Sequence, residues 1–466
     1  MTDTDYEILK SPAAKVTFRS STPVLDEGFE WAKKQAMAYA HFGENAVGLW
    51  YEAALPGRNS FCIRDVCHQS IGANILGLGR HTKNMLSQFI MNIHSSRDYC
   101  TYWEITDEGR PTPVDYTSDE DFWYNLPANF DLIRACYLQY LWTGDRTYLW
   151  DDSFNNFYSK TACEYLNAWD KDGDGIPEHY PHYGRRGIAS YNESDLNVRI
   201  GGDMIAIEYA GLLSYAEILR LRNEPRKADK YAEKARRLAD RYQAEWWNDA
   251  GKRFYGAMKQ DRTFYGEDYS ESNFLSLLYG IATSKEKLGA ALKNTLNNGA
   301  KNVEGMTYIP ELYYRYGLRD DGYKALLRLI DPGLHRREYP EVSFCAVSSF
   351  ITGLMGINAE KGSQVSTTAY ENKDVAWTEI RHMPIFQNEI SIKHIGSTCT
   401  EFTNCAGDSL MWKAAFPEET SFLYHNGKKA PSLREMGADG IIKSCIAVKV
   451  CPGEKHTISS HWSWQT

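Results

Sequence analysis

Acidic and basic side chains gather in short stretches that precede or separate predicted helices. In the first stretch, Arg64 and Asp65 end an apolar run and open a helical pattern. A guanidinium is a fixed fork of donors and a carboxylate is an acceptor, so this pair can bind neighbouring hydroxyl groups of one ligand. Arg58 and His68 flank the pair as further candidate contacts. The alternative is a helix-entry acid that forms a structural ion pair with Arg64.

A second group of stretches interleaves aromatic and polar residues. Aromatic rings offer flat apolar faces, and amide or carboxylate groups beside them accept and donate hydrogen bonds, which together suit a sugar ring. The alternative is a packed loop without a ligand. The candidate binding residues here are Trp103, Glu104, Trp123, Tyr124, Asn129 and Asp131.

Three acids are candidates for proton transfer. Glu193 and Asp195 lie in a loop beside Tyr191 and Asn192, where partial burial would raise a carboxyl pKa and favour a general acid. Glu341 follows Pro340 at the start of the last predicted helix, so it either caps that helix or acts as a base. A competing acidic cluster comprises Glu267, Asp268 and Glu271.

Other chemistries find little support. The stretch from Asp170 to Glu178 resembles the first part of a calcium loop, but Pro177 interrupts it and position twelve is Pro181, so a turn is favoured. The sequence has no HExxH, P-loop, GxSxG or GxGxxG motif. His68 and His81 do not have metal-ligand spacing. We therefore expect no metal and no cofactor.

Composition limits the class of protein. The 466 residues are 43% hydrophobic and 24% charged, which is a globular balance. The net charge of −9 and the lack of a basic stripe exclude a nucleic-acid partner, and no apolar run is long enough for a membrane span. The ten Cys residues form no CxxC pair, which indicates reduced thiols. We expect a cytoplasmic protein, or a periplasmic one if a signal peptide is removed. A homo-oligomer is compatible with the sequence.

The elements that must position these residues are mainly helical. Residues 1–24 are expected to be extended, residues 25–357 to form a helical domain, and residues 358–466 to form a small antiparallel β-sandwich. Twelve helices predict six hairpins closed into a ring, an (α/α)6 toroid whose loops build one mouth. The helices are expected at 25–41, 65–77, 80–94, 127–143, 152–168, 202–221, 225–247, 269–283, 285–298, 307–316, 319–330 and 341–355. The strands are expected at 365–370, 375–382, 389–395, 398–404, 410–416, 421–425 and 442–450.

This layout resembles the six-hairpin (α/α)6-barrel glycosidases, of which glucoamylase is an example. The resemblance implies that Arg64 and Asp65 hold the sugar that is cleaved off, that Glu193 is the general acid and that Glu341 is the general base. The junction near Phe350–Ile357 also resembles that of α-L-rhamnosidases, although their acid-rich pattern is not present around Asp65. The strings 55–65 and 123–131 are similar to those of glycoside hydrolase family 154, which implies β-glucuronidase activity.

The sequence therefore predicts an exo-acting glycoside hydrolase that inverts configuration, acts on an oligosaccharide or glycoside, and removes a terminal uronic acid. The arginines Arg58, Arg64, Arg185 and Arg186, with His68, would bind the sugar carboxylate. One alternative is a polysaccharide lyase or unsaturated-uronide hydrolase, with Tyr191, His182 or His68 as base. Others are an α-L-rhamnosidase-like hydrolase and a non-catalytic carbohydrate-binding protein.

Overall fold

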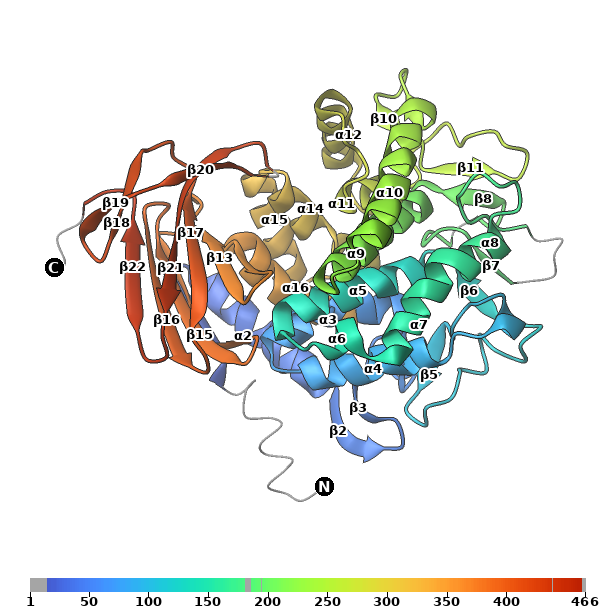
Figure 1. Ribbon diagram of the computed structural model, residues 1–466, viewed down its shortest axis with the longest axis horizontal. Coiled ribbons are helices and arrows are strands. Elements are labelled where there is room, and N and C mark those ends of the chain that lie inside the picture. The colour runs from blue at the N-terminus through green and yellow to red at the C-terminus, as the bar shows by residue number, and fades with distance from the viewer. Residues whose placement is uncertain (1–14, 181–185, 194, 438, 463–466) are drawn as a thin grey trace.

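A computed structural model describes residues 15–180, 186–193, 195–437 and 439–462. It has two parts that lie side by side along the long axis of the molecule, a helical barrel and a β-domain (Figure 1). The predicted (α/α)6 barrel followed by a β-sandwich is confirmed. Among the described residues, no helix is long and apolar enough to cross a membrane.

Six buried helical segments form the inner ring of the barrel. They contact one another in chain order, and the last packs against the first, which closes the ring. Their apolar residues face neighbours on both sides, so that these helices carry few exposed positions. The inner segments are α3 (Ile63–Ile75), α5 (Ala128–Thr143), α9 (Gly202–Leu221), α11 (Glu271–Leu278), α14 (Ile309–Arg315) and α16 (Pro340–Ser348), which continues as the π-helical segment η4 (Ser349–Leu354).

The outer helices are more amphipathic and cover the inner ring. One of the predicted helices, 152–168, is divided into α7 (Asp152–Lys160), a π-helical turn η2 (Thr161–Tyr165) and α8 (Leu166–Trp169). Short helices that the sequence did not predict are η1 (Ser95–Arg97), α6 (Thr147–Trp150) and α13 (Val303–Met306). The remaining outer helices are α2 (Pro23–Ala38), α4 (Gly79–Met91), α10 (Pro225–Glu245), α12 (Lys285–Asn298) and α15 (Arg319–Ile330).

Short strands in the barrel loops shape one end of the ring. Two of them, β6 (Trp123–Asn125) and β7 (Arg186–Ile188), pair in parallel and bring two distant loops together. Likewise, β4 (Ser60–Cys62) pairs with β5 (Glu104–Thr106) directly before α3. The other loop strands are β2 (Ala40–Asn45), β3 (Gly48–Tyr51), β8 (Val198–Gly201), β9 (Trp247–Asn248), β10 (Arg253–Phe254) and β11 (Ala257–Lys259).

The β-domain consists of two sheets, with strand orders β1-β14-β15-β16-β22-β18-β19 and β12-β13-β17-β21-β20. The N-terminal strand β1 (Thr17–Ser20) pairs with β14, so this part of the predicted extended segment belongs to the sandwich. The pairing is not wholly antiparallel, because β13 and β17 run parallel. The strands are β12 (Ile357–Glu360), β13 (Gln364–Thr368), β14 (Trp377–Ile385), β15 (Asn388–Ile395), β16 (Cys399–Ala406), β17 (Leu410–Phe416), β18 (Phe422–His425), β19 (Lys428–Pro431), β20 (Leu433–Met436), β21 (Ile442–Val450) and β22 (Lys455–Ser459).

Candidate functional site

A cavity of about 610 Å³ lies at the end of the barrel where these loop strands gather. Its volume falls in the range of small-molecule sites. Most of the residues that the sequence predicted for the site line it: Arg58, Arg64, Asp65, His68, Trp103, Glu104, Trp123, Tyr191, Asn192, Glu193 and Glu341. The loop order therefore brings together residues that lie almost 300 positions apart in the chain.

Two buried carboxyl groups of the cavity belong to Asp65 and Glu341. Asp65 is 9% exposed in the first turn of α3, and Arg64 Nε donates to its Oδ1 at 3.0 Å. Glu341 is 5% exposed in the first turn of α16, where Pro340 begins the helix. Burial, reinforced by the negative charge of Asp65, raises the pKa of Glu341 to about 8. Burial also raises the pKa of Asp65, and the Arg64 guanidinium opposes that shift.

Close packing of two helices brings these two acids to the same end of the barrel. Gly72 of α3 lies against the backbone of Phe344 in α16, and an added Cβ would come within 2.0 Å of the Phe344 carbonyl oxygen. Asp65 lies two helical turns before this contact and Glu341 one turn before it. A glycine at this crossing thus lets both acidic first turns reach the same cavity.

Glu193 lies near the open side of the cavity. Its side chain is exposed, and its Oε1 accepts a hydrogen bond from Asn125 Nδ2 at 2.6 Å. Other lining residues near the open side are Leu55 and Val114, which are 45% and 58% exposed. Glu193 and Glu341 therefore line one cavity at different depths.

The cationic side chains of the cavity are paired with acids. Arg58 Nη1 donates to Glu104 Oε2 at 2.7 Å, and the Ser60 hydroxyl donates to the other oxygen of Glu104. Burial nevertheless raises the pKa of Glu104 to about 7. Arg186 Nε lies 2.6 Å from Asp121 Oδ1. With Arg64 bound to Asp65, each arginine that lines the cavity in the described part of the chain has a carboxylate partner.

His68 and Tyr308 form part of the cavity wall. Their rings stack with centroids 3.5 Å apart, and His68 Nε2 lies 2.8 Å from Thr307 Oγ1. Burial lowers the pKa of His68 to about 3, because desolvation and the positive charges of Arg134 and Arg64 disfavour the protonated ring. His68 is therefore neutral near pH 7, and it cannot supply a positive charge to a ligand.

Four predicted site residues do not line this cavity. Tyr124 and Asn129 are buried and bond to each other, with Tyr124 OH donating to Asn129 Oδ1 at 2.5 Å, so they support the wall. Asp131 accepts a hydrogen bond from Tyr191 OH at 3.2 Å and faces a different cavity. Asp195 accepts hydrogen bonds from Tyr265 OH and from the Asn197 backbone N–H, which turn it away from Glu193. His182 and Arg185 lie outside the described residues.

The sequence missed several residues that line the cavity. Glu304 belongs to the short helix α13, and Tyr308 follows it. The four residues of α13 are too few to show a helical period in the sequence. Glu271 was noted in the competing acidic cluster, and it does line the cavity. The Oε1 atom of Glu271 and the Oε2 atom of Glu304 are buried without a hydrogen-bond partner. These two atoms could accept hydrogen bonds from ligand hydroxyl groups. The other missed polar residues are Asp115, Asn302 and Thr307.

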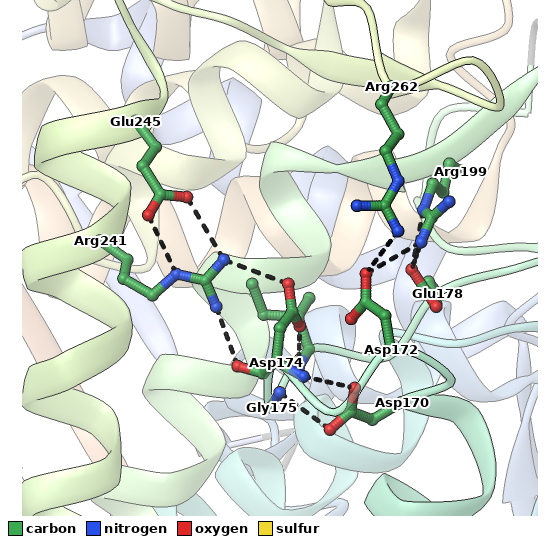
Figure 2. Close-up of polar contacts among 10 residues, drawn as sticks. Asp170, Asp172, Asp174, Gly175, Glu178, Arg199, Arg241, Glu245 and Arg262 are labelled. Carbon is green, nitrogen blue, oxygen red and sulfur yellow. Dashed lines mark hydrogen bonds and ion pairs between the residues drawn. The ribbon is translucent and has the colours of Figure 1, made fainter.

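The acidic stretch from Asp170 to Glu178 forms a turn outside this cavity. Both carboxylate oxygens of Asp170 accept backbone N–H bonds, from Asp174 at 2.9 Å and Gly175 at 2.8 Å. Figure 2 shows three arginines around the turn. Asp172 pairs with Arg199 and Arg262, and Asp174 pairs with Arg241. These cations neutralise the acids and attach the turn to β8 and α10.

The fold has known relatives. No protein-family model matches the chain, and no curated protein matches it either. The structure is similar to an α-L-rhamnosidase from Dictyoglumus thermophilum (TM-score 0.62, 11% identity, 96% of this chain and 50% of that chain). It is also similar to the GH78 family rhamnosidase of Bacillus sp. GL1 (TM-score 0.59, 15% identity, 84% of this chain and 41% of that chain). A third similar structure is a putative kojibiose phosphorylase from the human microbiome (TM-score 0.59, 10% identity, 96% of this chain and 64% of that chain).

This chain thus spans between 41% and 64% of the length of those three proteins. At such low identity the likeness concerns the fold. It confirms the predicted helical barrel with its β-domain.

Proposed function

We propose that this protein is an exo-acting glycoside hydrolase that removes a terminal sugar by general acid/base catalysis. The observation that carries the proposal is the pair of carboxyl groups, Glu193 and Glu341, that reach one sugar-sized cavity from different barrel loops. Hydrolysis of a glycosidic bond requires two such groups, whereas binding alone does not. The likeness to rhamnosidases and to a putative phosphorylase of disaccharides supports a carbohydrate ligand.

The depth of the two acids supports distinct roles. A terminal sugar that enters the cavity has its leaving group directed toward solvent, which is the side of the exposed Glu193. We therefore assign Glu193 as the proton donor. Glu341, 5% exposed beside Asp65, is the base that activates water. Its raised pKa means that it becomes ionised only as the pH approaches about 8.

Asp65 and Arg64 form the sugar-holding pair in this proposal. The carboxylate of Asp65 accepts hydrogen bonds from sugar hydroxyls and stabilises positive charge that develops at the anomeric carbon. The Arg64 guanidinium opposes the raised pKa of Glu341, and the negative charge of Glu193 contributes to the raised pKa of Arg64, so Arg64 interacts electrostatically with both catalytic groups. Trp103 and Trp123 provide the apolar walls.

The charges favour a neutral sugar over a uronic acid. A sugar carboxylate needs an unpaired cation, but Arg58, Arg64 and Arg186 are each paired with an acid, and His68 is neutral. Acidic residues outnumber basic ones in the described lining of the cavity. We therefore place an α-L-rhamnoside or another neutral glycoside ahead of a β-glucuronide.

The second candidate is a lyase or unsaturated-uronide hydrolase. His68 is neutral and is therefore a candidate base, although its lowered pKa makes it a weak one; Tyr191, whose pKa is raised by burial well above its ordinary value, would first have to lose a proton. A lyase must also neutralise the uronate carboxylate, and the paired arginines oppose this step. The hydrolase is therefore the stronger proposal.

A panel of 4-nitrophenyl glycosides tests the proposal with the full chain. We expect hydrolysis of one neutral glycoside, with the freshly released sugar in the inverted anomeric form by NMR. The variants Glu193→Gln and Glu341→Gln should each reduce kcat by about 10²–10⁴-fold. Asp195→Asn is the matched control and should retain activity. Wild-type rates in both Gln variants would disprove the assignment, and new ultraviolet absorbance from a conjugated double bond would indicate a lyase.

A further inference from the structure

A second cavity, of about 320 Å³, lies on the other side of the His68–Tyr308 pair. Both residues line both cavities, so their stacked rings contribute to the wall between the two. The second cavity is bounded by inner helices of the barrel and by residues of the β-domain, among them Asn358, Thr368 and Tyr370. It lies at the junction of the two parts of the molecule and takes no part in the mechanism proposed above.

Four cationic and three acidic side chains line the second cavity. Three of the cations form ion pairs with the three acids, and the fourth has no acidic partner in this described lining. Arg134 lies 3.8 Å from Asp131, Arg315 lies 3.1 Å from Glu311, and Lys443 lies 2.9 Å from Asp439. Arg319 has no carboxylate partner within ion-pair distance among the described residues. The described lining therefore carries one uncompensated positive charge when all these groups are ionised.

The guanidinium of Arg319 is held in place by the protein. Its Nη2 donates to the carbonyl oxygens of Gly353 and Leu354 at 3.0 and 3.2 Å. Its Cζ lies 3.6 Å from the ring centroid of Tyr370 and 4.5 Å from that of Tyr314. Burial lowers the pKa of Arg319 because this charge is poorly solvated. A buried, oriented cation of this kind is stabilised by a counter-ion.

Two buried polar atoms of the same cavity also lack hydrogen-bond partners, although one of them, Asp131 Oδ1, lies 3.8 Å from Arg134. Asp131 is 2% exposed and Tyr314 is 5% exposed, and Asp131 Oδ1 and Tyr314 OH form no hydrogen bond. Such atoms are costly unless a ligand or water satisfies them. Tyr314 OH offers a donor and Asp131 Oδ1 an acceptor, which suits a molecule with hydroxyl groups.

We propose that the second cavity binds a small hydroxylated molecule with a single oxyanion group, a carboxylate or a phosphate, whose charge pairs with Arg319. The volume equals that of about ten water molecules, which is enough for one monosaccharide. Apolar side chains, including Ile71, Leu138 and Trp142, cover the remaining wall. This site is separate from the catalytic cavity and does not depend on the sugar that is hydrolysed there.

Calorimetric titration of the full chain tests the site with three probes: glucuronate, glucose 6-phosphate and neutral glucose. We expect one or both anions to bind with 1:1 stoichiometry and glucose to bind much more weakly, and the stronger anion identifies the oxyanion. Arg319→Gln should weaken anion binding by about tenfold or more, because a charge-assisted bond is lost. Arg328→Gln, an exposed change on the same helix, is the matched control and should bind as the wild type does.

A second variant, Tyr314→Phe, tests the site even if Arg319→Gln fails to fold. The lost hydroxyl has no protein partner, so we expect an unchanged melting temperature and a several-fold weaker affinity. Glu193→Gln should leave anion binding unchanged because it alters only the first cavity. The proposal is overturned if neither anion binds at millimolar concentration, if glucose binds equally well, if Tyr314→Phe and Arg319→Gln both retain full affinity, or if Glu193→Gln alters it.

Discussion

For an activated 2,4-dinitrophenyl glycoside, whose leaving group needs no proton from Glu193, the rate of hydrolysis should rise steeply with pH between about 6 and 8, because the proposed base Glu341 must lose its proton. Burial and the charge of Asp65 raise the pKa of Glu341 to about 8. At that pKa, about one tenth of the Glu341 side chains are ionised at pH 7 and about one hundredth at pH 6. The value of kcat/KM should therefore fall by roughly tenfold for each pH unit below 7.

The assay is kcat/KM for the 2,4-dinitrophenyl form of the best glycoside of the panel, measured from pH 5 to 9.5 in buffers of constant ionic strength. Melting curves at each pH show whether a loss of rate comes from protonation of Glu341 or from unfolding of the protein. Asp65→Glu, which keeps the negative charge, is the control that should leave the midpoint high even where it slows the reaction. A profile that is flat from pH 5 to 7 would refute the raised pKa of the base. A rate that instead declines as the pH rises through 8 would make Glu341 the proton donor and reverse the two roles.

Further predictions concern stability and the choice of acid. The folded-state pKa of Glu341 lies above its ordinary value, so its contribution to stability is lost as the pH rises from about 4.5 to about 8; Glu341→Gln should therefore melt higher than the wild type at pH 8 and similarly at pH 4. Glu193→Gln should abolish most turnover, whereas Asp195→Asn should change it less than a few-fold. Steady-state kinetics measures both variants, and a larger loss in Asp195→Asn would contradict the assignment of Glu193. Gly72→Ala should cost about 2 kcal/mol or more in chemical denaturation, because the new methyl group meets the rigid backbone of Phe344; an unchanged unfolding midpoint would contradict that packing.

The helices were predictable because their apolar residues recur with a clear period. All twelve predicted stretches contain helix, whereas the π-helical turns at Thr161–Tyr165 and Ser349–Leu354 were not foreseen. A π-turn shifts the backbone hydrogen bond by one residue and leaves no compositional signal. Strand β20 (Leu433–Met436) was missed because all its residues are exposed, so it lacks the alternation that marks a half-buried strand.

The candidate site was predictable where the order of loops determines position. Glu193 and Glu341 occur at loops that a closed ring brings to the same end, and this required no side-chain detail. The sequence could not show which of Glu193 and Asp195 lines the cavity, because the position of Asp195 depends on its hydrogen bond with Tyr265 from another loop. The partners of Arg58 and Arg186 were equally hidden, since ion pairs across loops depend on the three-dimensional path of the chain.

The pairing of β1 with β14 has a consequence for how this protein acquires its native state. Thr17 lies opposite Arg381, so during synthesis β1 must wait for a partner strand that lies about 360 residues later in the chain. Contacts between such distant segments slow folding. During synthesis, β1 therefore has no native partner strand until β14 has been made.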